Sequence, residues 1–219
     1  MESNNMTIEN VNTEERQMCF CTLALGGKYC NFAMDLARDL EKYSSDKELL
    51  VLTNKPFFFK NQKNVLVFKH EPRSVYQYYD KIYVIEKALS LYESCIFLDS
   101  DIRIVDNVPT DLELPPGITA DSCYSIYKLY ENMYKQERRE NPNWQLISTV
   151  ANKLNINLDD VKFVWEYLFI VKKNSQTEEF IKLWKKIGSF YELNGRFGGE
   201  GESMGLAAAK LNIPINYDY

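Results

Sequence analysis

Two aspartates, Asp99 and Asp101, follow an apolar segment of the chain at a spacing of two residues. The segment, residues 94–98, has the composition of a buried strand and runs directly into the acidic motif. Residues two apart on an extended chain point the same way, so both carboxylates can face one site. Hard oxygen donors suit Mg²⁺ or Mn²⁺, with water and a diphosphate completing the coordination. The spacing therefore predicts a divalent metal that carries a diphosphate; the alternative interpretation is a turn cap beside a solvated side chain.

The elements before this motif alternate between short apolar runs and helical patterns. Strands are predicted at residues 19–25, 48–53, 64–68 and 94–98, and helices at residues 31–43 and from about residue 80. This alternation is typical of an α/β fold with a mostly parallel central sheet flanked by helices on both faces. Ligands of such sheets bind beyond the carboxyl ends of the strands, where the sequence places the two aspartates.

The second half of the chain is more mixed. The predictions are a helix or an ordered excursion at residues 124–140, helices at residues 144–154, 178–190 and 203–211, one long strand at residues 161–171, a glycine-rich loop at residues 195–201, and extended chain from residue 214. We expect residues 1–17 to form a flexible leader and residues 18–219 to form a single domain.

The composition excludes several classes of protein. The 219 residues include 31 acidic and 26 basic side chains, a net charge of −5, so no general nucleic-acid surface is expected. The sequence shows neither an apolar stretch long enough for a membrane span nor a signal peptide, which predicts a cytoplasmic protein. His70 is the one histidine, and the five cysteines form no Cys-x-x-Cys pair. Buried free thiols are therefore expected rather than a zinc site, and the oligomeric state stays open.

The strand that ends in Asp-x-Asp, together with the helix before it, resembles the core of glycosyltransferases with the GT-A fold. Residues 79–82 and 94–101 carry this resemblance, and residues 22–25 (Thr-Leu-Ala-Leu) are similar to the first strand of the family. Residues 200–203 (Glu-Gly-Glu-Ser) are similar to the start of a late helix in blood-group ABO-type retaining enzymes. The resemblance spans roughly residues 18–219 of the chain.

The resemblance implies a GT-A-like domain that moves a sugar from a UDP-linked donor to a hydroxyl of a carbohydrate or another acceptor. Mn²⁺ or Mg²⁺ at the two aspartates would neutralise the diphosphate. Tyr29 lies where a ring stacks on the nucleobase in this family, with a rim tyrosine as the alternative. Lys81 lies near the arginine that glycogenin-like enzymes carry, and it would assist the phosphates. The residues implied in donor binding are Leu25, Tyr29, Lys81, Asp99, Ser100 and Asp101.

Two glutamates near the end of the chain are the candidate catalytic residues. Glu202 follows a glycine-rich segment and opens a predicted helix, where the helix dipole favours a carboxylate. We expect Glu202 to lie over the donor sugar as nucleophile, as stabiliser of an oxocarbenium-like transition state, or as base, with Glu200 as the second candidate. An ordinary first-turn carboxylate is the alternative. Trp165 and Tyr167 are either core residues or a platform for a sugar acceptor.

Two other functions remain open. Phosphatases of the haloacid dehalogenase type also place Asp-x-Asp after a buried strand, and Asp159 and Asp160 would then be their late metal-binding acids. That motif usually opens its domain, whereas two strand–helix units precede it here. It also usually has Thr or Val four residues after its first aspartate, and Arg103 occupies that position here. A non-catalytic binder of nucleotide-sugars on the same scaffold is the third possibility.

Overall fold

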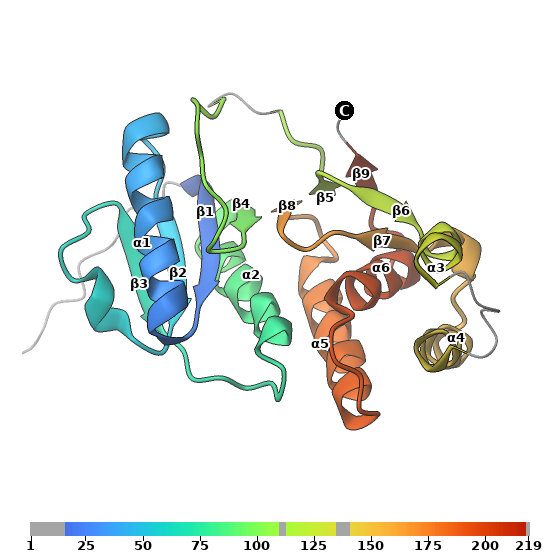
Figure 1. Cartoon of the computed structure of the whole chain (residues 1–219). Helices are drawn as coiled ribbons and strands as arrows, with labels where there is room; N and C mark the ends of the chain where they lie inside the picture. The colour runs from blue at the N-terminus through green and yellow to red at the C-terminus, as the bar shows by residue number, and fades with distance from the viewer. Residues whose placement is uncertain (1–15, 110–112, 135–140, 218–219) are drawn as a thin grey trace, which may run out of the picture.

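Strands from both halves of the chain form the central sheet of the computed structural model, which describes residues 16–109, 113–134 and 141–217 (Figure 1). Seven strands lie in the order β3-β2-β1-β4-β8-β5-β9, and β6 pairs with β7 in a separate two-stranded sheet. The strands are β1 Arg16–Ala24, β2 Leu49–Thr53, β3 Val65–Lys69, β4 Tyr92–Leu98, β5 Gly117–Ala120, β6 Cys123–Ser125, β7 Lys162–Val164, β8 Leu168–Lys172 and β9 Ile215–Tyr217.

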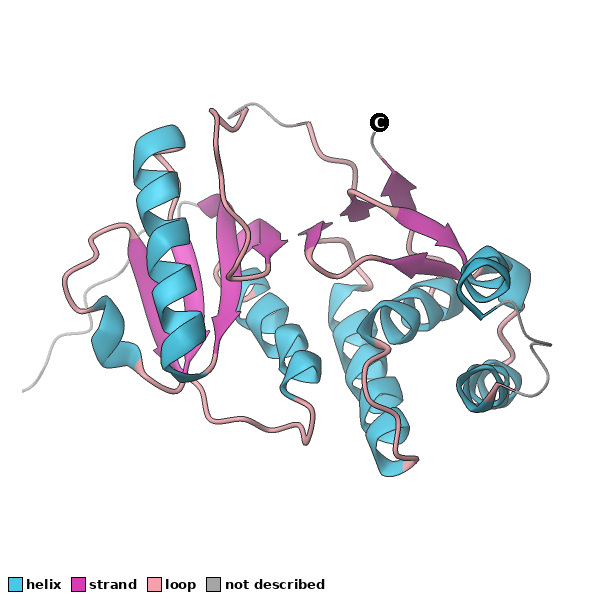
Figure 2. Cartoon of the chain, in the orientation of Figure 1, coloured by secondary structure: helices cyan, strands magenta, loops and turns pink. Residues whose placement is uncertain are grey.

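Helices lie between most of these strands (Figure 2). The α-helices are α1 Gly26–Tyr43, α2 Lys81–Leu89, α3 Ile126–Tyr134, α4 Pro142–Leu154, α5 Thr177–Leu193 and α6 Glu200–Lys210. Short 3₁₀ helices are η1 Pro56–Phe59, η2 Gln77–Asp80 and η4 Leu158–Asp160. Among the helices of the described residues, none is both long enough and apolar enough to cross a bilayer.

The two faces of the sheet are covered by different helices. Successive residues of a strand point to opposite faces. Phe20, Leu49 and Ile96 therefore pack with α1, whereas their neighbours Cys21 and Leu50 join the larger core that includes α2 and α5. This arrangement confirms the predicted α/β fold with helices on both faces of the central sheet.

One strand, β8, runs against the other strands of the central sheet. The pairs β3–β2, β2–β1, β1–β4 and β5–β9 are parallel, whereas β8 runs antiparallel to both β4 and β5. The sheet is thus mostly parallel, as predicted. The chain winds outward from β1 to β3 and then returns to β4 on the other side of β1. Such a reversal point opens a crevice at the carboxyl ends of the two strands.

Several predicted boundaries were wrong. The strand predicted at residues 161–171 is two strands, since β7 pairs with β6 while β8 pairs with β4 and β5, and these different partners require a turn between them. Strand β5 was not predicted, and α1 begins at Gly26 rather than at residue 31. Arg16 and Gln17 belong to β1 rather than to the leader, and residues 1–15 lie outside the described residues.

The cysteines are free thiols, as the sequence predicts. Four of them are buried, Cys123 is partly buried, and none of the five forms a disulfide; the four are Cys19, Cys21, Cys30 and Cys95. Burial raises the pKa of the Cys21 thiol well above its ordinary value, and neighbouring Cys95 adds to this shift. The thiols are therefore packed as small apolar side chains.

Candidate active site

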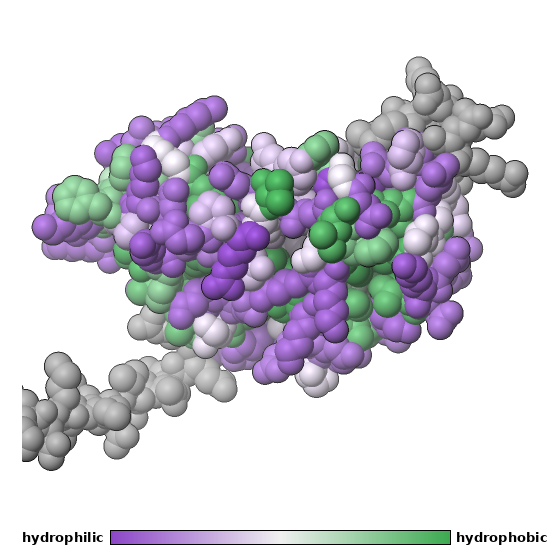
Figure 3. All heavy atoms as spheres, turned by 90° about the horizontal axis from the view of Figure 1, so that it is seen from below, coloured by the Kyte–Doolittle hydropathy of each residue, from purple (hydrophilic) through white to green (hydrophobic). Residues whose placement is uncertain are grey.

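The carboxyl ends of β1 and β4 border a cleft of about 380 Å³, which we call the first cleft. Its lining comes from the end of β1, the start of α1, the segment before α2 and the motif after β4. The lining residues are Leu23, Leu25, Tyr29, Val75, Tyr76, Gln77, Tyr78, Lys81, Asp99, Ser100 and Asp101. The structure thus brings together all six residues implied in donor binding. Seen from below, hydrophobic side chains reach the surface beside a hollow near the middle of the molecule (Figure 3).

Lys81 and Asp99 form an ion pair in the first cleft. The Lys81 ammonium lies 2.8 Å from Oδ1 of Asp99 and donates a hydrogen bond to Oδ2 at 3.1 Å. The Lys81 side chain is 8% exposed and that of Asp99 is 32% exposed. Burial raises the pKa of Asp99 above its ordinary value, Lys81 opposes this shift, and the charge of Asp101 adds to it. Lys81 therefore favours the charged form of Asp99 and holds its orientation.

The two aspartates differ in what surrounds them. Asp101 is exposed, and within the described residues its carboxylate makes no hydrogen bond or ion pair. Each oxygen of Asp99 that meets Lys81 still has a second lone pair. Two carboxylates on one cleft fit a hard divalent cation whose other ligands are water and ligand oxygens. In the described part of the chain, no three His, Cys, Asp or Glu side chains meet to form a metal site by themselves.

Asp80 holds the loop that forms one wall of the first cleft. Asp80 is fully buried and accepts hydrogen bonds from the backbone N–H groups of Arg73 and Ser74, both at 2.9 Å. Its Oδ2 also lies 2.8 Å from Nε2 of His70. The structure makes His70, the one histidine of the sequence, a buried partner of this carboxylate. By holding Arg73 and Ser74, Asp80 positions residues 75–78, which include the exposed ring of Tyr78.

Tyr29 reaches the first cleft because α1 starts earlier than the sequence predicts. Gly26 opens the helix with a φ of +82°, a conformation that favours glycine, and its N–H donates to the side chain of Asn54 at 2.9 Å. Tyr29 therefore lies near the start of α1, with its ring exposed. The ammonium of Lys28 lies 5.6 Å from the centre of this ring. An exposed ring beside a cation suits a planar, anionic ligand such as a nucleotide.

A second cleft, of about 370 Å³, adjoins the first. Tyr78, Lys81 and Asp99 line both clefts, so the clefts meet at the ion pair. The other lining residues of the second cleft are Trp165, Glu166, Tyr167, Gly198 and Glu200. The antiparallel direction of β8 brings its start beside the Asp-x-Asp motif. The N–H of Asp99 donates to the carbonyl of Tyr167, the residue before β8, at 2.9 Å.

Two glutamates in the second cleft have unusual acidities. Burial raises the pKa of Glu166 to about 7; Glu200 and, more weakly, Glu202 add to the shift, and Lys81 opposes it. Oε2 of Glu166 is buried without a hydrogen-bond partner among the described residues. Burial also raises the pKa of Glu200. A carboxyl group with a pKa of about 7, as in Glu166, can exchange a proton with a substrate near neutral pH.

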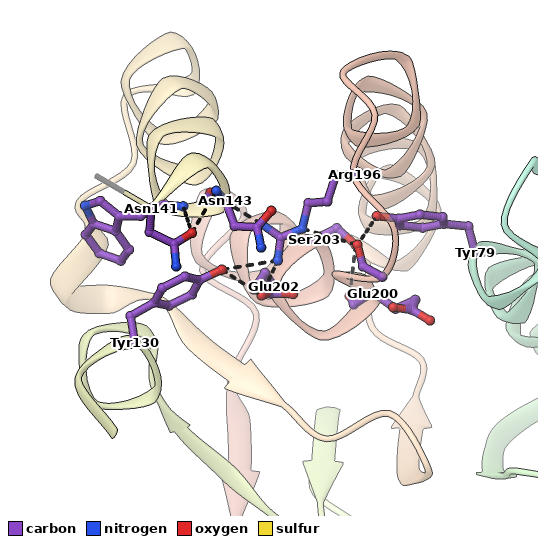
Figure 4. A network of polar contacts seen from close by, with 10 residues as sticks. Tyr79, Tyr130, Asn141, Asn143, Arg196, Glu200, Glu202 and Ser203 are labelled. Carbon is purple, nitrogen blue, oxygen red and sulfur yellow. Dashed lines mark hydrogen bonds and ion pairs between the residues drawn. The ribbon is translucent and has the colours of Figure 1, made fainter. Parts of the chain in front are cut away.

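Glu202 lies on the other side of α6, in a buried polar network (Figure 4). Its carboxylate forms an ion pair with Arg196 and accepts a hydrogen bond from the hydroxyl of Tyr130 at 3.1 Å. Residues two apart on a helix are related by a rotation of about 200° about the helix axis, so their side chains point to nearly opposite sides. Since α6 begins at Glu200, this carboxylate and that of Glu202 diverge, as Figure 4 shows. Glu202, which the sequence places over a donor sugar, lines neither cleft, whereas Glu200 lines the second.

Glycines on α6 allow the helix to lie directly on the backbone of β7. A Cβ at Gly201 would lie 2.2 Å from the carbonyl oxygen of Val164, and one at Gly205 would lie 1.9 Å from that of Lys162. No other residue fits at such distances. Gly201 lies in the segment predicted as a glycine-rich loop, but it belongs to α6 and lets that helix approach a strand. This packing places Glu200 beside Glu166.

The residues that matter for the phosphatase alternative lie away from both clefts. Arg103 donates two hydrogen bonds to Asp39 of α1, at 2.6 and 2.7 Å, and so ties the segment after the acidic motif to that helix. Asp159 and Asp160 are exposed in η4 and line neither cleft. The structure therefore does not bring the late acids of that alternative to Asp99.

Comparison with known proteins supports the fold. No protein-family model and no curated protein matches the sequence. Among solved structures, the apo structure of WbbM, a bifunctional glycosyltransferase, is similar over 93% of this chain, with a TM-score of 0.60 and 12% sequence identity. The match covers 39% of the WbbM chain, so this chain spans less than half of that protein. The chain thus shares its fold with part of WbbM.

Sequence reasoning did not single out Glu166 as a candidate functional residue. It lies in a stretch where aromatic residues alternate, Phe163, Trp165, Tyr167 and Phe169, and this pattern predicts an unbroken strand. An acid inside such a stretch was the signal that could have located it. Its position beside Lys81 depends on the turn between β7 and β8, which the alternating pattern conceals.

Proposed function

We propose that this chain is a metal-dependent glycosyltransferase that takes a sugar from a UDP-linked donor and passes it to an acceptor hydroxyl. The observation that carries the proposal is the meeting of the Asp-x-Asp motif, Lys81 and Tyr29 in one cleft at the reversal point of the sheet. The similarity of the fold to that of a glycosyltransferase supports it.

The first cleft is assigned to the donor. Asp101, with Asp99, would hold Mn²⁺ or Mg²⁺, and Tyr29 would stack on the base. A bound divalent cation stabilises the charge that develops on the departing diphosphate. Lys81 keeps Asp99 charged and in place, at a distance of 2.8 Å. The nucleotide diphosphate leaves with the electron pair of the bond to the anomeric carbon.

The second cleft is assigned to the acceptor, with the reacting sugar at the boundary between the clefts. Glu200 takes the role first expected of Glu202, because it lines this cleft whereas Glu202 is paired with Arg196. The acceptor oxygen forms the new bond to the anomeric carbon, and Glu200 accepts the proton that this oxygen loses. Trp165 and Tyr167 offer ring faces to the acceptor.

Thermal unfolding with UDP, with Mn²⁺ and with both together tests the donor assignment. We expect the pair to stabilise the protein well beyond the two additions taken singly; 100 times the dissociation constant of a ligand contributes about 2.7 kcal/mol. Asp101→Asn should remove the metal-dependent part. Asp159→Asn, an exposed acid outside both clefts, is the matched control and should keep it. Equal stabilisation by UDP without metal, or in Asp101→Asn, would contradict the proposal.

A second assay separates the three functions that the sequence leaves open. Slow, metal-dependent hydrolysis of a UDP-sugar without acceptor supports a transferase. Binding of the UDP-sugar with no turnover, whichever acceptor is added, supports a non-catalytic binder. Hydrolysis of an aryl phosphate that is lost in Asp99→Asn supports the phosphatase and overturns the transferase. Within the transferase, Glu200→Gln should reduce turnover far more than donor affinity.

A further inference from the structure

Beyond the second cleft, aromatic and acidic side chains gather at the surface. The hydroxyl of Tyr167 donates a hydrogen bond to the carboxylate of Asp121. Tyr124 and Tyr217 are 47% and 42% exposed. Both lie near the Tyr167 hydroxyl. We call Asp121, Tyr124 and Tyr217 the outer platform.

Strand ends from three parts of the chain make the outer platform continuous with the second cleft. Asp121 follows β5, whose last residue pairs with Tyr217 of β9 and also with β8. Tyr124 lies on β6, which pairs with β7, and β7 ends just before Trp165. Trp165 and Tyr167 line the second cleft. A ligand that leaves this cleft beside Tyr167 therefore meets the outer platform.

The chemistry of this surface suits a sugar chain. Ring faces pack against the C–H faces of sugar rings, and carboxylate oxygens accept hydrogen bonds from hydroxyl groups. Asp121 on the platform and Glu166 and Glu200 in the cleft make the surface acidic, whereas Lys81 is already paired with Asp99. An anionic chain would be repelled by these carboxylates.

We propose that the outer platform is a second acceptor subsite and that the acceptor is an uncharged carbohydrate chain of at least two sugar units. The terminal unit occupies the second cleft, and the next unit lies on Tyr124 and Tyr217. This inference rests on the proposed function, and it adds the class and minimum length of the acceptor.

Fluorescence of Trp165 offers a direct binding assay that needs no turnover. The other two tryptophans, Trp144 and Trp184, are 9% and 3% exposed, whereas Trp165 is partly exposed in the second cleft. The probes are methyl glycosides of glucose, galactose and N-acetylglucosamine, with the corresponding 1,4-linked disaccharides and trisaccharides. We expect a disaccharide or trisaccharide to protect the fluorescence of Trp165 from quenching by acrylamide at a lower concentration than the corresponding methyl glycoside does. Equal potency of the single sugar, or no protection by any probe, would overturn the inference.

Substitutions on the outer platform locate the second unit. Tyr124→Ala and Tyr217→Ala should each weaken trisaccharide binding roughly two- to tenfold, as expected for the loss of one aromatic contact, and leave the methyl glycoside unchanged. Both side chains are exposed, so the variants should fold. Phe57→Ala removes an 80% exposed ring that lines neither cleft, and it is the matched control. Trisaccharide binding that is unchanged in both platform variants would overturn the subsite, as would equal binding of a trisaccharide ending in a uronic acid.

The same protein, tested with UDP and Mn²⁺, distinguishes a failure of the acceptor subsite from a failure of the proposed function. A metal-dependent response to UDP without protection of Trp165 refutes the subsite and leaves the donor assignment standing. Protection of Trp165 that depends on Tyr124 and Tyr217, without any response to UDP, refutes the proposed function and with it the acceptor role of the platform.

Discussion

The two halves of the molecule build their clefts by different means. In the N-terminal half, the lining residues follow the ends of parallel strands or open the next helix, as Leu25, Lys81 and Asp99 do. In the C-terminal half, Glu166 lies in a turn between strands of two different sheets, and Glu200 opens a helix that glycines hold against β7. The position of the first cleft thus follows from the order of the elements, whereas that of the second depends on long-range packing.

The acidic residues of the two halves differ in the same way. The pair of Lys81 with Asp99 lies in a cleft, and Asp101 beside it stays exposed to a ligand. Glu202 is enclosed with Arg196, and both side chains are less than a tenth exposed. A carboxylate near a glycine loop therefore indicates a catalytic group only if its partner is not already inside the protein.

The largest effect is expected at the buried ion pair. Arg196→Met leaves the carboxylate of Glu202 buried without its cation, which should lower the free energy of unfolding by about 3–5 kcal/mol. Urea denaturation measures this loss, and adding Glu202→Gln to the first substitution should recover part of it. If Glu202→Gln alone abolished turnover while leaving stability intact, Glu202 would belong to the reaction and the contrast between the halves would fail.

A large effect is also expected where α6 meets β7. Gly201→Ala places a Cβ 2.2 Å from a backbone oxygen, so the helix must move, at a cost of about 3 kcal/mol in unfolding free energy. The matched control is Gly27→Ala in α1, where the nearest atoms to an added Cβ lie at 3.8 Å and 3.9 Å, and alanine favours the helix. The same urea titration should show no loss for the control. Equal midpoints for the two variants would show that the C-terminal packing is loose.

A smaller, pH-dependent effect is expected for Glu166→Gln. The folded pKa of about 7 exceeds the ordinary value of 4.5, so the folded state holds this proton more tightly than the unfolded state. The stability that this adds is fully present below pH 4.5 and is lost as pH rises through about 7. Relative to the parent, the variant should therefore gain stability between pH 5 and pH 8, on the order of 1–3 kcal/mol.

Thermal unfolding at the two pH values measures this gain. Glu178→Gln, whose side chain is 91% exposed, is the matched control and should show no such dependence. A stability difference between Glu166→Gln and the parent that is constant with pH would show that the pKa of Glu166 is not raised. Glu166 would then not exchange protons in the second cleft near neutral pH.

The smallest effect is expected at the ion pair of Arg103 with Asp39 in the N-terminal half. Arg103→Met removes two hydrogen bonds to Asp39, and these lower the pKa of that carboxyl below its ordinary value. Because the Arg103 side chain is 56% exposed, water replaces much of what is lost, and the urea midpoint should change far less than in Arg196→Met. A comparable loss in both variants would remove the distinction between the buried and the exposed pair.

Much of the N-terminal half could be predicted from the sequence. Continuous apolar strands followed by helical patterns are local signals, and they located β1, β2, β3 and β4 within a few residues. The Asp-x-Asp motif follows the last of these strands directly, so its place at the edge of the sheet needed no knowledge of distant contacts. The start of α1 was missed because Gly26-Gly27 is typical of a turn, although here it opens a helix.

The sequence alone determined the class of the fold, the covered faces of its sheet and the acidic motif at a strand end, because periodicity and chain order are properties of neighbouring residues. Tertiary structure alone decided which glutamate faces the cleft. Glu200 and Glu202 have the same local sequence signals, but the start of the helix turns them to opposite sides, where one meets Glu166 and the other meets Arg196. Partners so far apart in the chain are chosen by packing, which no local pattern records.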